Sequence, residues 1–308
     1  MMQFFLNGLS RGSVDALVAL GFGLIFFAAG TFHIAHGAIY TAAAFTCYAF
    51  SGYFDYSLWI GIPAGLLVAI VIGTAIEYII YRPLLDPRKS HQGSSPVIMI
   101  SSLGTYVIIV NMIALIAGNE QRTILNGIQP TLVFGNLVLT LVQLAQIVTC
   151  IIVISGALFF LWKTSFGRTI RALANDTELI SILGYDIWRL RLLVFAIGSL
   201  LAGLGGILSA LDVGTYPDVG FSAFLIAAVA CMIGGYGYLL MPVVGALLLG
   251  IVQSIVVWKW DAKWSSAAVY GLLVLFLVMC PGGLVQLFDR IRILLGFSPT
   301  LQKRGEES

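Results

Sequence analysis

The sequence contains very little charge. It has 16 basic and 14 acidic residues among 308, so 10% of the chain is charged, whereas soluble domains carry about 25%. Hydrophobic residues make up 59%, and the mean hydropathy is +1.00. This composition excludes a soluble globular domain. Apolar runs near the ~20 residues that span a bilayer recur along the chain, without the alternation typical of a β-barrel. The sequence therefore predicts an all-α polytopic membrane protein.

Residue arrangements typical of catalysis are also missing. The sequence has neither a metal-ligand cluster nor a glycine-rich phosphate loop ending in Gly-Lys-Ser or Gly-Lys-Thr. We therefore expect no enzyme activity, no ATP hydrolysis by this chain and no cofactor or metal bound to it. The four cysteines fall inside apolar runs, which favours core packing over disulfides. The basic residues lie at membrane edges, so no nucleic-acid surface is expected.

Polar residues divide the chain into eight or nine transmembrane helices within one domain, residues 1–308. The count depends on the short run 221–233. Residues 1–11 are predicted to form a short, mildly apolar segment before the first transmembrane helix. Asp15, near the start of that helix, is expected at the membrane interface. The predicted helices cover residues 12–30, 37–54, 58–81, 96–117, 137–162, 192–211, 221–233, 239–258 and 265–280.

Three segments contain most of the basic residues. Residues 82–95, 163–191 and 289–308 have three, five and four of the sixteen. Basic residues favour the cytoplasmic side of a membrane, and nine spans put all three segments on the same side. We therefore predict an N-terminus outside and a C-terminus inside.

The polar segment 163–191 has its own helix signals. Asn175 or Asp176 can cap a helix start, Glu178 follows Asn175 at the spacing of a capping box, and Gly184 is typical of a left-handed stop. One apolar face of roughly 160° lies between these signals, formed by Leu179, Ile180, Ile182 and Leu183. This pattern, a capped helix with an exposed apolar face, indicates a cytoplasmic coupling helix that docks onto another protein. The alternative is an interfacial helix lying among lipid headgroups.

Two interruptions of apolar helices mark a candidate solute pathway. One contains His33, His36 and Gly37, and the other contains Gly234 and Gly235. Broken helices expose backbone polar groups that can bind a solute inside a bilayer. The alternatives are a structural histidine in the first case and a tight turn in the second. Two histidines are only half of a metal site, so no metal is predicted.

Short motifs follow one another along nearly the whole chain. They include Gly8-Leu-Ser-Arg-Gly12, Ala35-His-Gly37, Tyr81-Arg-Pro-Leu84, Gly167-Arg-Thr-Ile-Arg-Ala172, Leu183-Gly-Tyr185, Gly234-Gly-Tyr-Gly237 and Pro281-Gly-Gly-Leu284. In this order they resemble the permease subunits of high-affinity branched-chain amino acid ABC importers of the LivH kind. The resemblance implies the ABC-importer permease fold and a location in a bacterial cytoplasmic (inner) membrane.

The resemblance also implies partners. They are a second, LivM-like permease, two cytoplasmic LivG/LivF-like ATPases that bind ATP and magnesium, and an extracytoplasmic solute-binding protein. In the family, the segment matching 163–191 meets the ATPase, and Arg168 and Arg171 would hold it there or at the anionic inner leaflet. The coupling residues expected on this basis are Gly167, Arg168, Arg171, Ala172, Asn175, Asp176, Glu178, Leu179, Ile180, Leu183 and Gly184.

His33 departs from the family pattern, which usually has Asn at this position. Asn is a neutral donor and acceptor, whereas His gains charge near a pH of about 6.5. The predicted function is inward transport of branched-chain or related amino acids. Urea, short amides and other small organic acids are alternative solutes, and a stand-alone channel or facilitator is an alternative of another class.

Overall fold

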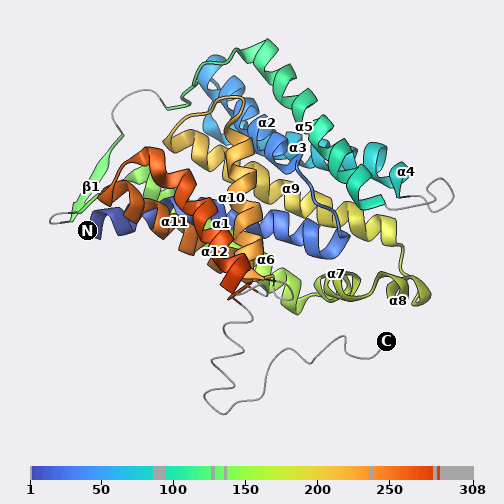
Figure 1. Cartoon of the computed structure of the whole chain (residues 1–308). Coiled ribbons are helices and arrows are strands. Elements are labelled where there is room, and N and C mark those ends of the chain that lie inside the picture. The colour runs from blue at the N-terminus through green and yellow to red at the C-terminus, as the bar shows by residue number, and fades with distance from the viewer. Residues whose placement is uncertain are drawn as a thin grey trace.

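The computed structural model describes residues 2–85, 94–125, 129–134, 137–235, 239–279 and 283–284, and these residues are mostly helical (Figure 1). The π-helical turns η1 and η2 directly continue the helices before them. The elements are α1 (Met2–Ala29), α2 (His36–Tyr48), η1 (Ala49–Tyr53), α3 (Leu58–Ala75), η2 (Ile76–Tyr81), α4 (Arg82–Leu84), α5 (Ser94–Ala117), β1 (Thr131–Phe134), β2 (Leu137–Thr140), α6 (Leu141–Lys163), α7 (Ser165–Asn175), α8 (Thr177–Ile182), α9 (Ile187–Asp212), α10 (Val219–Gly234), α11 (Met241–Lys259), the 3-10 turn η3 (Ala262–Trp264) and α12 (Ser265–Met279).

Seven helical segments of the described chain are long and apolar enough to cross a membrane. They are Met2–Ala29, Leu58–Leu84, Pro96–Ala117, Leu141–Lys163, Ile187–Asp212, Met241–Lys259 and Ala262–Met279. The shorter apolar helix α10 and the helix formed by α2 and η1 pack among them. The predicted polytopic all-α fold with eight or nine helices is thereby confirmed.

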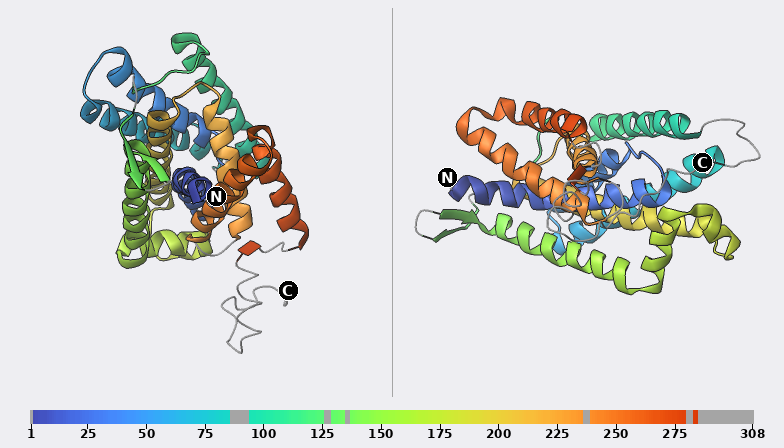
Figure 2. Two further views of the ribbon diagram at one scale, coloured as in Figure 1. Left: turned by 90° about the vertical axis from the view of Figure 1, so that its left-hand side faces the viewer. Right: turned by 60° about the horizontal axis from the view of Figure 1, so that its bottom comes forward.

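Helix α1 lies at the centre of the bundle, surrounded by α6, α9, α10 and α11 (Figure 2, left). It begins at Met2, and the backbone of its first turns packs directly on Gly250 of α11 through Gly8 and Gly12. The predicted separate segment over residues 1–11 is therefore wrong. Asp15 lies roughly 20 Å along this helix, at 1.5 Å per residue, and is 9% exposed. It is buried by protein, and its predicted place at the membrane interface stays a prediction.

Helices α2 and α10 approach closely because glycine faces glycine where they meet. A Cβ atom on Gly37 or Gly220 would collide with the carbonyl oxygen of the other residue. The hydroxyl oxygen of Thr41 accepts a hydrogen bond from Gly220 N at 3.2 Å. In lipid, helices associate through such close packing of small residues and through hydrogen bonds between helices.

A two-stranded antiparallel sheet lies at the end of the bundle that carries the N-terminus (Figure 1). In its register, Thr131 of β1 faces Thr140 of β2. Gln3 of α1 holds the sheet, since its amide donates to Val138 O at 2.7 Å and accepts from Val138 N at 2.9 Å. The sequence predicted a loop followed by a helix here, and the structure instead starts α6 after the strand pair.

Candidate functional site

The segment 163–191 begins with a sharp corner between α6 and α7. The hydroxyl oxygen of Thr164 caps α7 by accepting a hydrogen bond from Gly167 N at 3.0 Å. A Cβ atom on Gly167 would collide with the carbonyl oxygens of Phe160 and Leu161. The corner therefore requires glycine, and Figure 2 shows α7 turning away from the direction of α6.

Helix α7 has one face buried in the bundle and the other exposed. Ile170 and Leu173 are buried, whereas Arg168 is exposed. Arg168 donates a hydrogen bond to Lys163 O at 3.4 Å, and the guanidinium of Arg171 lies 6.0 Å from the ring centre of Trp162. Both arginines thus stay close to the α6–α7 corner. Their predicted contact with an ATPase or with anionic lipid stays a prediction.

Asp176 starts α8. Its backbone is extended, and its carboxylate accepts a hydrogen bond from Leu179 N at 2.9 Å. Asn175 is instead the last residue of α7 and donates to Arg171 O at 3.1 Å. Of the two predicted caps, Asp176 is therefore the right one, and a capping box that begins at Asn175 is wrong. The side chain of Glu178 lies outside the described residues.

The apolar residues of α8 divide between two faces. Ile180 is 3% exposed and packs with Leu173 and Leu190, while Ala172 and Ile187 pack against the same cluster. The prediction that Ile180 belongs to the exposed face is wrong, because this side chain attaches α8 to α7 and α9. The side chains that remain 53%, 76% and 63% exposed are Leu179, Ile182 and Leu183.

Gly184 follows α8 with a φ of +83° and donates a backbone hydrogen bond to Ser181 O at 3.0 Å. The predicted left-handed stop is confirmed. Asp186 then caps α9, since its carboxylate accepts from Trp188 N at 3.0 Å and from Arg189 N at 3.3 Å. The turn before α7 and the turn after α8 are therefore both capped by hydrogen bonds. The two helices lie at the same end of the bundle as α4 (Figure 1).

His33 and His36 are completely buried between α1 and its neighbours. Nδ1 of His33 lies 2.8 Å from the hydroxyl of Tyr81, and Nε2 of His36 lies 3.3 Å from Val18 O. The other ring nitrogen of each histidine has no hydrogen-bond partner. A solute could reach these rings only if helices moved apart, so their role in a solute pathway stays a prediction.

Gly234 and Gly235 stand where α10 ends. Gly235 has a φ of +87°, and Gly234 packs on the backbone of Met241 at the start of α11. Gly37 likewise makes a close helix contact, with Gly220 of α10. Gly37 and Gly234 thus have packing roles and Gly235 adopts a conformation that favours glycine, while contact of the three with a solute stays a prediction.

A buried ion pair between Glu77 and Arg191 was not predicted. Nε and Nη2 of Arg191 lie 2.5 and 3.2 Å from the two carboxylate oxygens of Glu77, and Nη1 donates to Ala29 O at 2.6 Å. The side chains are only 1% and 9% exposed. The pair ties the end of α1 to η2 and α9. In the sequence, Glu77 falls within the predicted span 58–81 and Arg191 at the end of the polar segment 163–191, so nothing pairs them.

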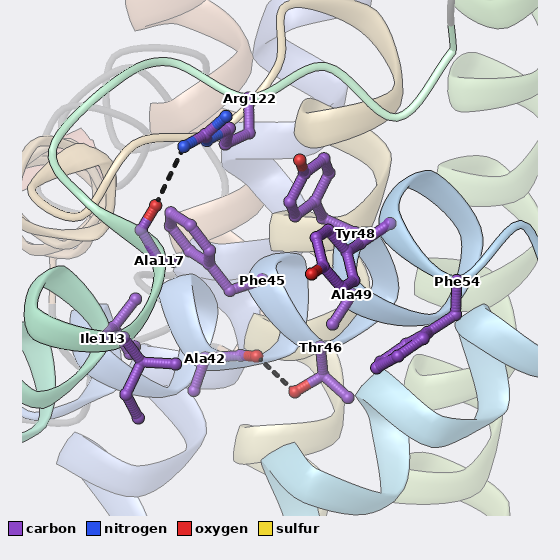
Figure 3. A pocket seen from close by; sticks show the side chains of 11 residues that line it. Ala42, Phe45, Thr46, Tyr48, Ala49, Phe54, Ile113, Ala117 and Arg122 are labelled. Carbon is purple, nitrogen blue, oxygen red and sulfur yellow. Dashed lines mark hydrogen bonds between the residues drawn. The ribbon is translucent and has the colours of Figure 1, made fainter.

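A cavity of about 570 Å³ lies between α2 with η1 and the end of α5 (Figure 3). Its walls are mostly aliphatic and aromatic, including Phe45, Tyr48 and Ile113. Arg122 stands at its rim and donates to Ala117 O at 3.3 Å. An apolar wall of this kind suits a lipid chain or a packed helix better than a polar solute. No motif of the sequence indicated this cavity.

Residues 4–278 match the family described as the permease component of branched-chain amino acid transport systems. The chain is 27% identical over 298 residues to the high-affinity branched-chain amino acid transport system permease protein BraD of Pseudomonas aeruginosa. It is 26% identical over 299 residues to the corresponding permease protein LivH of Escherichia coli K12. Each alignment covers 92% of this chain and 95% of the relative.

A solved structure also shares this fold. The structure of PsaBC from Streptococcus pneumoniae in complex with Fab contains a chain that matches with a TM-score of 0.51 and 15% identity, covering 94% of this chain and 95% of that one. The family predicted from the ordered motifs is confirmed, and with it the function of a transport permease. The chain belongs to the permease family of branched-chain amino acid transport systems.

Proposed function

We propose that this chain is one of two permease subunits in an ABC importer that moves branched-chain or related amino acids inward across a bacterial cytoplasmic membrane. The names of BraD and LivH, each a high-affinity branched-chain amino acid permease, support this solute class. The partners would be a LivM-like permease, two LivG/LivF-like ATPases carrying ATP and magnesium, and an extracytoplasmic binding protein. Urea, short amides and other small organic acids are the alternative solutes.

The proposed orientation has the N-terminus outside and the C-terminus inside. Arg82 and segment 163–191 lie at one end of the bundle, and the N-terminus and the β-sheet lie at the other (Figure 1). The basic side chains of the first end would face the cytoplasm, as the preference of Lys and Arg for that side requires. We call this end the cytoplasmic end and the opposite one the outer end.

The observation that carries the proposed coupling role is the exposed apolar face of α8. Leu179, Ile182 and Leu183 project from a capped helix at the cytoplasmic end. Exposed apolar clusters on a polar segment are typical of interaction sites. Ile170 and Ile180 connect this unit to the bundle, since Ile170 belongs to a hydrophobic core cluster of the bundle and Ile180 packs on α9. A movement imposed on α8 by an ATPase would therefore reach the membrane helices.

The test is to replace Leu179 and Leu183 with Asp in the complete importer. Burying two carboxylates in an apolar contact is costly, so we expect ATPase binding to weaken more than about tenfold. The measurements are co-purification of the ATPases and ATP-dependent leucine uptake by proteoliposomes. Val133→Asp is the matched control, because Val133 is 64% exposed at the outer end and should leave ATPase binding unchanged.

An importer that keeps its ATPases and its uptake with both Asp substitutions would refute the coupling role. The exposed face would then be assigned to lipid headgroups, the alternative considered above. Correct insertion of the variant is checked by its yield and size in detergent solution.

His33 is proposed to influence which solute is carried. The experiment compares uptake of leucine, urea and a short amide by the wild-type importer and by His33→Asn. A changed order of preference supports contact between this position and the solute. An unchanged order makes His33 a structural residue whose Nδ1 holds the Tyr81 hydroxyl.

A further inference from the structure

A second cavity, of about 370 Å³, lies among α1, α2, α6, α9 and α10 at the outer end. Its volume falls within the range of about 300–1,000 Å³ found for small-molecule sites. Whereas Arg122 is the one charged residue among those that line the cavity of Figure 3, the wall of this cavity includes Arg11, Asp15 and Asp212. Of the three charged residues, Arg11 and Asp212 are exposed and Asp15 is buried, and a buried charge within a membrane bundle is costly and calls for a functional explanation.

Asp15 is the least satisfied group of this cavity. The residue is 9% exposed, and its Oδ2 atom has no hydrogen-bond partner. The polar groups beside it are already engaged. Ser10 donates to Gln146 Oε1 at 3.0 Å, and Gln146 donates to Leu208 O at 2.8 Å. Gln146 is thus fixed between α1, α6 and α9, which leaves the Asp15 carboxylate without an amide donor from this side chain.

The cavity wall carries charges of both signs, as binding of a free amino acid requires. Arg11 lies one helical turn before Asp15 on α1 and lines the same cavity, and Asp212 adds a second carboxylate from α9. None of the ion pairs among the described residues joins Arg11 to Asp15. The two side chains are therefore not joined by a direct ion pair, and a ligand could lie between them. Val14 and Ile226 supply an apolar part of the wall.

We propose that this cavity is an entry site that binds the amino acid group of the solute before it crosses the bundle. Asp15 accepts hydrogen bonds from the α-ammonium, Arg11 donates to the α-carboxylate, and the apolar wall contacts the aliphatic side chain. A bound ammonium supplies the partner that Asp15 lacks, which offsets the cost of the buried carboxylate. The inference rests on the proposed amino acid solute. It assigns recognition of that solute within the membrane part of the importer to this chain.

The test measures binding to the purified complex of permeases and ATPases, without the solute-binding protein and its own amino acid site. The ligands are radiolabelled leucine and two competitors of the same skeleton. One competitor, 3-methylbutylamine, lacks the carboxylate, and the other, 4-methylpentanoate, lacks the ammonium. Asp15→Asn should weaken leucine and the amine about tenfold to a hundredfold, as expected for a hydrogen bond to a charged group, and leave the acid unchanged.

Arg11→Gln should give the reverse pattern, weakening leucine and the acid but not the amine. Its side chain is exposed, so this variant keeps the inference testable if Asp15→Asn does not assemble. Asp261→Asn is the matched control. Asp261 is an exposed carboxylate at the outer end that caps the turn before α12, and it does not line the cavity.

Three results would overturn the inference: a wild-type complex that binds none of these ligands, equal binding by wild type and Asp15→Asn, or equal losses for amine and acid. The proposed function fails separately, when the complete wild-type importer with its binding protein takes up no leucine. Because the amine and acid are tested without transport, the two failures are distinguishable.

Discussion

Replacing Arg191 with Leu should destabilise the protein strongly. The change removes two hydrogen bonds to Glu77 and one to Ala29 O, and it leaves a carboxylate that is 1% exposed without its partner. Breaking a buried ion pair from one side costs about 3–5 kcal/mol. Arg189→Leu is the matched control. Arg189 is 85% exposed and pairs with Asp186 at 3.0 Å, so its loss should cost only about 0–1 kcal/mol.

The assay is thermal unfolding of the purified chain in detergent, followed by circular dichroism. A double variant with Glu77→Leu and Arg191→Leu should unfold at a higher temperature than Arg191→Leu alone, because no buried charge is then left unpaired. The reasoning is refuted if Arg191→Leu unfolds no earlier than Arg189→Leu. It is also refuted if the effects of the two Leu substitutions simply add, since coupled partners should not be additive.

Two further substitutions test the packing. Gly37→Ala should destabilise by about 1–3 kcal/mol, because the new methyl group meets the carbonyl oxygen of Gly220, whereas Gly104→Ala meets no atom within 4 Å and should be neutral or slightly stabilising in the same unfolding assay. Ile180→Ala should detach α8 from the bundle at a cost of about 2–5 kcal/mol and expose segment 163–191 to limited proteolysis, and equal cleavage of Leu179→Ala and Ile180→Ala would contradict this.

Hydrophobicity was sufficient to predict the helical membrane class and the position of most helices. A span needs a long apolar run, and that signal is local. Local chemistry also predicted Gly184 as a helix stop. It could not assign Ile180 to the buried side of α8, because a helix of six residues shows apolar residues on more than one face and only the fold decides which face packs on α7 and α9.

The strand pair had a sequence signal that the prediction did not use. Thr131–Phe134 and Leu137–Thr140 are rich in β-branched and aliphatic residues and are separated by Gly-Asn, which is typical of a hairpin. The strong apolar run that follows concealed this signal. Gln3 then secures the strands from the far end of the chain, which no local pattern reveals.

The charged features inside the bundle could not be predicted because they depend on distant segments. Glu77 and Arg191 are 114 residues apart in sequence, and each looks like an ordinary residue near a span end. Asp15 is buried only because α1 becomes the central helix. Both features depend on how the helices are arranged in space, and local patterns in a single sequence do not predict that arrangement.

The most direct test of the central claim is leucine uptake by proteoliposomes that contain both permeases, the two ATPases and the binding protein. The account predicts inward uptake that requires ATP and is lost when the ATPases are omitted. Leucine flux through this chain alone, without ATPases or ATP, would contradict it and would indicate a channel or facilitator. Absence of ATP-dependent leucine uptake by the complete assembly would contradict the proposed solute.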